Sequence, residues 1–154
     1  MDQPFRYYLR VRYQECDAQN VVFNSRYSDY ADLCISEFLR AAMPGRDPFD
    51  GSFEIQVVRQ LIEWKAPARY NDVLELAAAV ARFGTSSFTV AIEMRRAGTA
   101  DVLATAETVY VCVDSATWTK RPVSAEEREM LSQGARGRRI DHAGYLTAAM
   151  MEGR

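Results

Sequence analysis

Hydrophobic and polar residues alternate along most of the chain, which is the pattern of half-buried β-strands. Residues 5–13 place Phe, Tyr, Leu and Val at every second position, with arginines among the residues between them. The alternation returns over four later segments that are separated by turn-forming Gly, Pro, Asn or Asp, namely residues 53–64, 73–82, 87–94 and 102–113. Within the first of these four segments the alternation changes phase, which predicts a β-bulge or a strong bend. The pattern therefore predicts five strands.

Two stretches show the helical period instead. Over residues 27–42 apolar side chains recur every three or four positions in a wide stripe, so we expect other elements to enclose this helix. Pro44 and Gly45 follow and end it. Ser124 and Glu127 have the spacing of a capping box, which predicts a short helix that begins there and extends through Leu131.

This order of elements predicts one α+β domain over residues 1–133. Strands joined by short turns pair antiparallel, and the long helix covers one face of the sheet. One helix cannot cover both faces, and the strand at 102–113 is apolar on both, so we expect a second copy to cover part of the sheet. Residues 134–154 form a basic, glycine-rich link and then a tail, in which residues 140–151 are expected to form a last short helix.

Composition and charge exclude several classes of protein. The chain has 154 residues, enough for one domain, and its net charge of −2 argues against a nucleic-acid partner. No apolar run is long enough to span a bilayer and the N-terminus has no apolar signal core, so we expect a cytoplasmic protein. Three scattered cysteines do not form a disulfide framework.

The single histidine, His142, narrows the possible chemistry. A His-rich metal site is excluded, and a Ser-His-Asp triad would need this one residue near the end of the chain. The sequence has no glycine-rich phosphate loop. We therefore expect neither a metal nor a cofactor, and any catalysis must use carboxylates, amides, hydroxyls or backbone dipoles.

The segment between the first strand and the long helix carries the candidate chemistry. Asp17 lies just past the strand, and the N-terminus of the helix follows, where unpaired N–H groups favour negative charge. A carboxylate facing such a helix end can activate water or attack directly, while the amides receive the oxyanion. Taken alone, the residues favour a simpler interpretation, in which Asp17 or Asn24 caps the helix or stabilises a turn.

A set of residues in this segment favours the catalytic interpretation. It consists of Tyr13, Glu15, Asp17, Asn20, Val21, Val22, Phe23 and Tyr27, with weaker matches over residues 62–72, 82–88, 109–114 and 120–122. These residues resemble the motif of the hotdog-fold acyl-CoA thioesterases of the 4-hydroxybenzoyl-CoA thioesterase type, which include the Tol-Pal-associated enzymes. The resemblance implies a hotdog fold, an antiparallel sheet of about five strands wrapped around one long central helix. It also implies an acyl-CoA substrate and a homodimer or homotetramer with active sites at subunit interfaces.

The resemblance assigns roles to individual residues. Asp17 corresponds to the catalytic carboxylate, a general base or nucleophile, and a backbone N–H near Asn24 polarises the thioester carbonyl. The substrate-binding residues are Asn20, Phe23, Tyr27, Ser86 and Ser87, of which Tyr27 also fits a core position. The phosphates of coenzyme A can pair with basic side chains, for which the candidates are Arg82, Lys120 and Arg121.

The sequence departs from the family pattern at two of these positions. Asn20 replaces the usual glycine, although Asn tolerates the left-handed backbone that the turn needs. Asn24 stands where one subgroup carries His or Tyr, which leaves the detailed mechanism and the substrate class open.

Four functions follow as hypotheses. The first is a thioesterase acting on a small or medium acyl-CoA, and the second is a non-catalytic hotdog protein that binds acyl-CoA or lipid. A hotdog dehydratase or hydratase usually needs a histidine in the central region, where this chain has none. The pair Glu15 and Asp17 could suggest a glycosidase, but acidic residues at the end of a strand are usually solvated.

Overall fold

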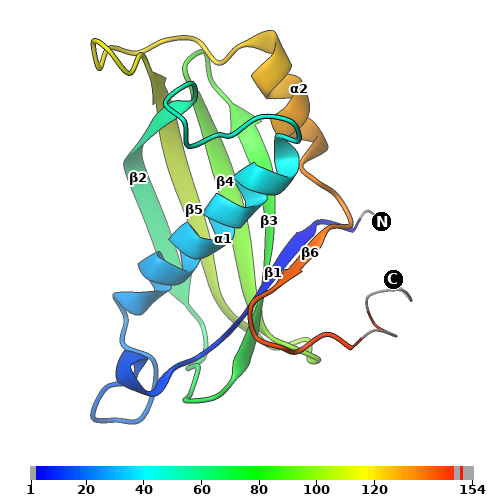
Figure 1. The fold of residues 1–154 in the computed structure, drawn as a ribbon. Helices are drawn as coiled ribbons and strands as arrows, with labels where there is room; N and C mark the ends of the chain where they lie inside the picture. Colours follow the sequence, from blue (N-terminus) through cyan, green and yellow to red (C-terminus); the bar gives the residue numbers. More distant parts are fainter. Residues whose placement is uncertain (1–2, 148–149, 151–154) are drawn as a thin grey trace.

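Six strands form one sheet, and a long helix lies across one of its faces (Figure 1). The computed structural model describes residues 3–147 and residue 150. The strand order is β2-β5-β4-β3-β1-β6. The elements are β1 (Phe5–Arg10), η1, a 3-10 helix (Tyr13–Glu15), α1 (Arg26–Ala42), β2 (Glu54–Trp64), β3 (Val73–Phe83), β4 (Ser87–Arg96), β5 (Val102–Val113), α2 (Ala125–Gln133) and β6 (Arg139–Asp141).

All neighbouring strands pair antiparallel except β1 and β6, which are parallel. The predicted bulge in β2 is confirmed, since its register against β5 shifts between Val57 and Arg59. The α+β architecture around a central helix is also confirmed, although the sheet has six strands rather than about five and α2 is a second helix.

The core lies between α1 and the sheet. The apolar stripe of α1 is buried as its period requires, with Tyr27, Tyr30, Cys34 and Phe38 all buried. The sheet contributes alternate side chains that point toward the helix, including Leu74, Leu76, Phe88, Val90, Met94 and Ala106. This packing fixes the position of α1 on the sheet, and with it the position of the helix N-terminus.

The first strand is shorter than its alternation predicts. β1 ends at Arg10, and Tyr13 lies in the following 3-10 helix, where it is 75% exposed and packs edge-to-face against Tyr70. Tyr8, which the alternation places on the same side of the strand as the arginines, is buried instead. Its hydroxyl donates a hydrogen bond to the carboxylate of Glu75, and its ring stacks on Tyr145. The C-terminal segment that carries Tyr145 therefore covers this side of β1.

The prediction of a helix over residues 140–151 is wrong at its start. Arg139–Asp141 form β6, which pairs with β1, and the N–H of His142 continues the pairing by donating to the carbonyl of Tyr8 at 2.9 Å. The open edge of β1 offers backbone partners that the local periodicity does not reveal. Residues 148–149 and 151 of the predicted helix lie outside the described residues, and the domain boundary after residue 133 stays a prediction.

Candidate active site

Asp17 lies in a tight hairpin between η1 and α1. The N–H of Asp17 donates to the carbonyl of Val21 at 2.9 Å, and the N–H of Asn20 donates to the carbonyl of Asp17 at 2.9 Å. Asn20 turns the chain with φ 68°, so the asparagine does adopt the left-handed conformation expected of the usual glycine.

The carboxylate of Asp17 is half-buried and only partly engaged. Its Oδ1 accepts the N–H of Gln19 at 2.8 Å. Within the described residues, Oδ2 accepts no hydrogen bond, so this oxygen has capacity left for a water molecule or a substrate. The simpler interpretation is therefore right in one respect, because Asp17 stabilises its own turn.

The N-terminus of α1 has no cap. Ser25 occupies the cap position, but its backbone is helical and its side chain makes no capping hydrogen bond. The N–H groups of residues 26–28 donate to the carbonyls of residues 23–25. In the part of the chain that the structure describes, the N–H groups of Asn24 and Ser25 donate no hydrogen bond. Neither Asp17 nor Asn24 caps this helix, and the amides remain available to an anion.

Glu15 contradicts the expectation that an acidic residue here would be solvated. Only 5% of the residue is exposed, and both carboxylate oxygens are engaged. Burial raises the pKa of Glu15, but hydrogen bonds from the Arg12 backbone, the Tyr30 hydroxyl and the Arg12 guanidinium outweigh burial and lower the pKa below its ordinary value. The signal that sequence reasoning missed was Tyr30, because a buried tyrosine on an apolar helix face needs an acceptor for its hydroxyl.

The structure brings one group of predicted site residues together. Asp17, Asn20, Phe23 and Asn24 share the loop before α1, where Phe23 is exposed. Tyr27, in the first turn of α1, is only 2% exposed and packs edge-to-face against Trp64. It therefore occupies a core position beside the candidate site.

A second group lies at the opposite end of the sheet. Ser86 and Ser87 are at the turn from β3 to β4, and Lys120 and Arg121 follow β5. β1 leads into the Asp17 loop next to Val73, which is the first residue of β3, so the length of β3 separates the two groups. Eleven residues of strand span about 35 Å. Within one chain, these residues do not meet Asp17.

The basic candidates have partners of their own. Arg121 pairs with Glu127 at 2.9 Å, and Arg82 pairs with Glu107 at 3.2 Å on the outer face of the sheet. The side chain of Lys120 is exposed. These contacts give two of the three residues a structural role, and binding of coenzyme A by any of them stays a prediction.

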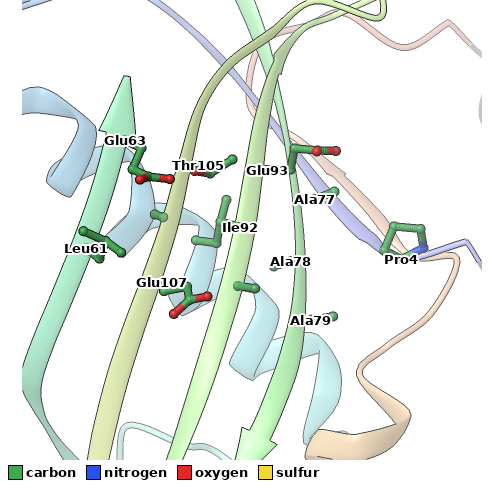
Figure 2. Close-up of a pocket in the computed structure, with 12 residues that line it drawn as sticks. Pro4, Leu61, Glu63, Ala77, Ala78, Ala79, Ile92, Glu93, Thr105 and Glu107 are labelled. Atoms are coloured by element: carbon green, nitrogen blue, oxygen red, sulfur yellow. The ribbon is translucent and has the colours of Figure 1, made fainter. Parts of the chain in front are cut away.

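A pocket of about 340 Å³ lies on the face of the sheet away from α1 (Figure 2). Alanines of β3 and β4 form its floor, and Glu63, Glu93 and Glu107 line it together with Leu61 and Pro4. No predicted site residue lines this pocket, so it is separate from the Asp17 loop. Across residues 3–147 and 150, no cluster of three or more His, Cys, Asp or Glu is placed to hold a metal ion.

Comparison with known proteins identifies the family. Residues 11–133 match the family model of the Thioesterase-like superfamily. The chain belongs to this superfamily. Acyl-CoA thioester hydrolase YbgC of Escherichia coli is 30% identical over 111 residues, which are 71% of this chain and 82% of that protein. A putative esterase of Aquifex aeolicus is 36% identical over 74 residues, 47% of this chain, and the match spans only 58% of that relative.

A solved structure supports the fold. The 1,4-dihydroxy-2-naphthoyl-CoA thioesterase from Synechocystis superposes with a TM-score of 0.73 at 22% identity, covering 82% of this chain and 94% of that one. The predicted hotdog fold and membership of the thioesterases are confirmed, and at the level of its family the chain is a hydrolase. No helix in the described part of the chain is both long and apolar enough to cross a membrane.

Proposed function

We propose that this chain hydrolyses the thioester of a small or medium acyl-CoA, with Asp17 as general base or nucleophile. The observation that carries the proposal is that one loop holds both a partly engaged carboxylate and, nine residues further along, the uncapped N-terminus of α1. The YbgC relative is named for the same reaction class.

The chemistry needs few groups. As general base, Asp17 takes a proton from water while the water oxygen attacks the thioester carbonyl carbon. The negative charge that develops on the carbonyl oxygen is stabilised by the N–H groups of Asn24 and Ser25 and by the dipole of α1. Collapse of this intermediate breaks the C–S bond, and coenzyme A leaves as a thiolate. As nucleophile, Asp17 attacks the same carbon itself and water then hydrolyses the anhydride.

The working site is proposed to form between two copies. β2 is an edge strand of 11 residues that exposes Val57, Val58, Leu61 and Trp64, whereas the short β6 covers the edge of β1. Antiparallel pairing of two β2 strands would extend the sheet and bury these side chains. It would also bring the far end of one sheet, with Ser86, Ser87 and Lys120, beside the Asp17 loop of the other. The predicted site residues then come together in the dimer.

Dimer formation is tested by sedimentation of the chain with and without Val58→Lys, a charge on the proposed interface. The expected results are a dimer for the unaltered chain and dissociation with loss of activity for the variant. A strictly monomeric chain with full activity would refute the shared site.

A small acyl group fits a pocket near the start of β2. The pocket has a volume of about 220 Å³ and is lined mainly by apolar side chains, with Leu39, Pro48, Phe49, Phe53 and Ile55 among them. Antiparallel pairing of β2 brings it toward the partner's Asp17 loop. The limited volume supports a small or medium acyl group rather than a long chain.

A cytoplasmic location stays a prediction.

The central test is Asp17→Asn, assayed by thiol release from short, medium, long and aromatic acyl-CoAs. We expect kcat to fall by about 10³-fold or more, with an unchanged circular dichroism spectrum. Asp29→Asn is the matched control, because Asp29 is an exposed carboxylate in the first turn of α1 that pairs with Arg26 at 3.3 Å. A fully active Asp17→Asn variant refutes the role of Asp17. Tight binding of a non-hydrolysable acyl-CoA without thiol release by the unaltered chain would favour a binding protein instead.

A further inference from the structure

Glu15 and Tyr30 connect the Asp17 hairpin to the helix that carries the amides. We propose that they are positioning residues, which hold the carboxylate of Asp17 in register with the N-terminus of α1. The inference rests on the proposed function, because it assumes that these two groups act on one thioester.

The side chain of Glu15 forms the first connection. Its Oε1 accepts the hydroxyl of Tyr30 at 2.8 Å and the backbone N–H of Arg12 at 2.8 Å. Its Oε2 accepts Nε of Arg12 at 3.0 Å. Tyr30 is 1% exposed and lies in the second turn of α1, so its hydroxyl cannot move without moving the helix. One buried carboxylate therefore joins the chain before Asp17 to α1.

The backbone of Glu15 forms the second connection. Its carbonyl accepts the N–H of Phe23 at 2.9 Å, and the carbonyl of Phe23 accepts the N–H of Arg26, the first residue of α1, at 2.9 Å. Asn24 and Ser25, whose N–H groups donate to no group among the described residues, lie between these two hydrogen bonds. Glu15 therefore forms one hydrogen bond to Phe23, which precedes these two amides, and another to Tyr30, which follows them. Asp17 lies two residues after Glu15.

This arrangement separates positioning from stability. Loss of the Tyr30 hydroxyl removes the side-chain link to α1 and leaves the backbone connection and the ion pair between Glu15 and Arg12 in place. Loss of the Glu15 charge weakens that ion pair, yet an amide oxygen at the same position still accepts the Tyr30 hydroxyl. The first change should affect catalysis more than stability, and the second should do the reverse.

The experiment compares Tyr30→Phe with Glu15→Gln in acyl-CoA hydrolysis and in chemical denaturation. We expect Tyr30→Phe to lower kcat about tenfold with KM unchanged, because a displaced reacting group slows chemistry without weakening binding. Glu15→Gln should keep kcat within about twofold and lower the denaturation midpoint further than Tyr30→Phe does.

Tyr7→Phe is the matched control. Tyr7 is also a buried tyrosine whose hydroxyl bonds a side chain, Nδ1 of His142 at 2.9 Å, but it lies on β1 away from the hairpin. It should leave kcat unchanged. Tyr30→Phe with kcat within twofold of the unaltered protein overturns the inference, as does an equal fall in kcat for Tyr7→Phe. An active Asp17→Asn variant overturns the proposed function itself, so the two failures are distinguishable.

Discussion

The helices α1 and α2 begin in opposite ways. At the start of α2, Oγ of Ser124 accepts the N–H of Glu127 at 3.1 Å, and the Glu127 carboxylate accepts the N–H of Ser124 at 3.0 Å. This reciprocal capping box satisfies the helix end within the chain itself. At the start of α1 the cap position makes no such bond. The N-terminus of α2 is thus capped and that of α1 is not, which is the arrangement that the proposed function requires of α1.

A buried glutamate accompanies each helix start, and the two carboxylates have different tasks. Glu127 caps its own helix and pairs with Arg46 and Arg121, at 3.0 Å and 2.9 Å. The carboxylate of Glu15 instead accepts the backbone N–H and the guanidinium of Arg12, which precedes η1, and it is joined to α1 by the hydroxyl of Tyr30. Glu127 stabilises the N-terminus of α2, whereas Glu15 does not cap the N-terminus of α1.

Removal of the Glu127 carboxylate is expected to have the largest effect on stability. Glu127→Ala leaves Arg46 and Arg121 without their buried partner and removes one of the two hydrogen bonds of the capping box, so the free energy of unfolding should fall by about 3–5 kcal/mol. The measurement is urea denaturation, with thiol release as a check that the folded fraction keeps its kcat. Glu126→Ala is the control, because the Glu126 side chain is 80% exposed and should contribute about 0.5 kcal/mol or less. A loss below about 1 kcal/mol for Glu127→Ala would contradict the proposed difference.

The same carboxylate makes stability depend on pH. Burial raises the pKa of Glu127, but the hydrogen bonds from Arg121, Ser124 and Arg46 outweigh burial and lower it from 4.5 to about 2. A pKa that folding lowers adds stability above pH 4.5, and this contribution is lost as the pH falls toward 2. The contribution is on the order of 3 kcal/mol. The stability difference between the unaltered chain and Glu127→Gln should therefore shrink across this range, and a difference independent of pH would count against the ion pairs.

The sequence predicts the elements whose signal is local. Alternation predicts four of the five expected strands closely, the phase change predicts the bulge after Val57, and the Ser124 capping box predicts α2. The strand β6 depends on the open edge of β1, which lies more than a hundred residues earlier in the chain. No local period carries that information, and so a helix is predicted there in error.

The candidate site likewise has a part that local sequence predicts and a part that depends on distant residues. The motif brings Asp17 and Asn24 into one loop because they are close in sequence. The buried state of Glu15 depends on Tyr30, fifteen residues later on another element, and the pairing of Arg121 depends on α2. Long-range partners of this kind decide whether a charged residue serves the fold or a ligand, and single residue types do not reveal them.

A carboxylate introduced at the start of α1 has the smallest expected effect on stability and gives the sharpest test of the comparison between α1 and α2. Ser25→Asp places a carboxylate at the position that Ser124 occupies on α2, next to the N–H groups of Asn24 and Ser25 that donate no hydrogen bond within the described residues. The free energy of unfolding should rise by about 0.5–1 kcal/mol, while kcat should fall about tenfold because the new charge opposes the oxyanion. Ser124→Ala, the control on α2, should cost about 1 kcal/mol of stability and leave kcat unchanged. If Ser25→Asp stabilises the chain and keeps full kcat, the open end of α1 does not receive the reacting carbonyl, and its missing cap has no part in catalysis.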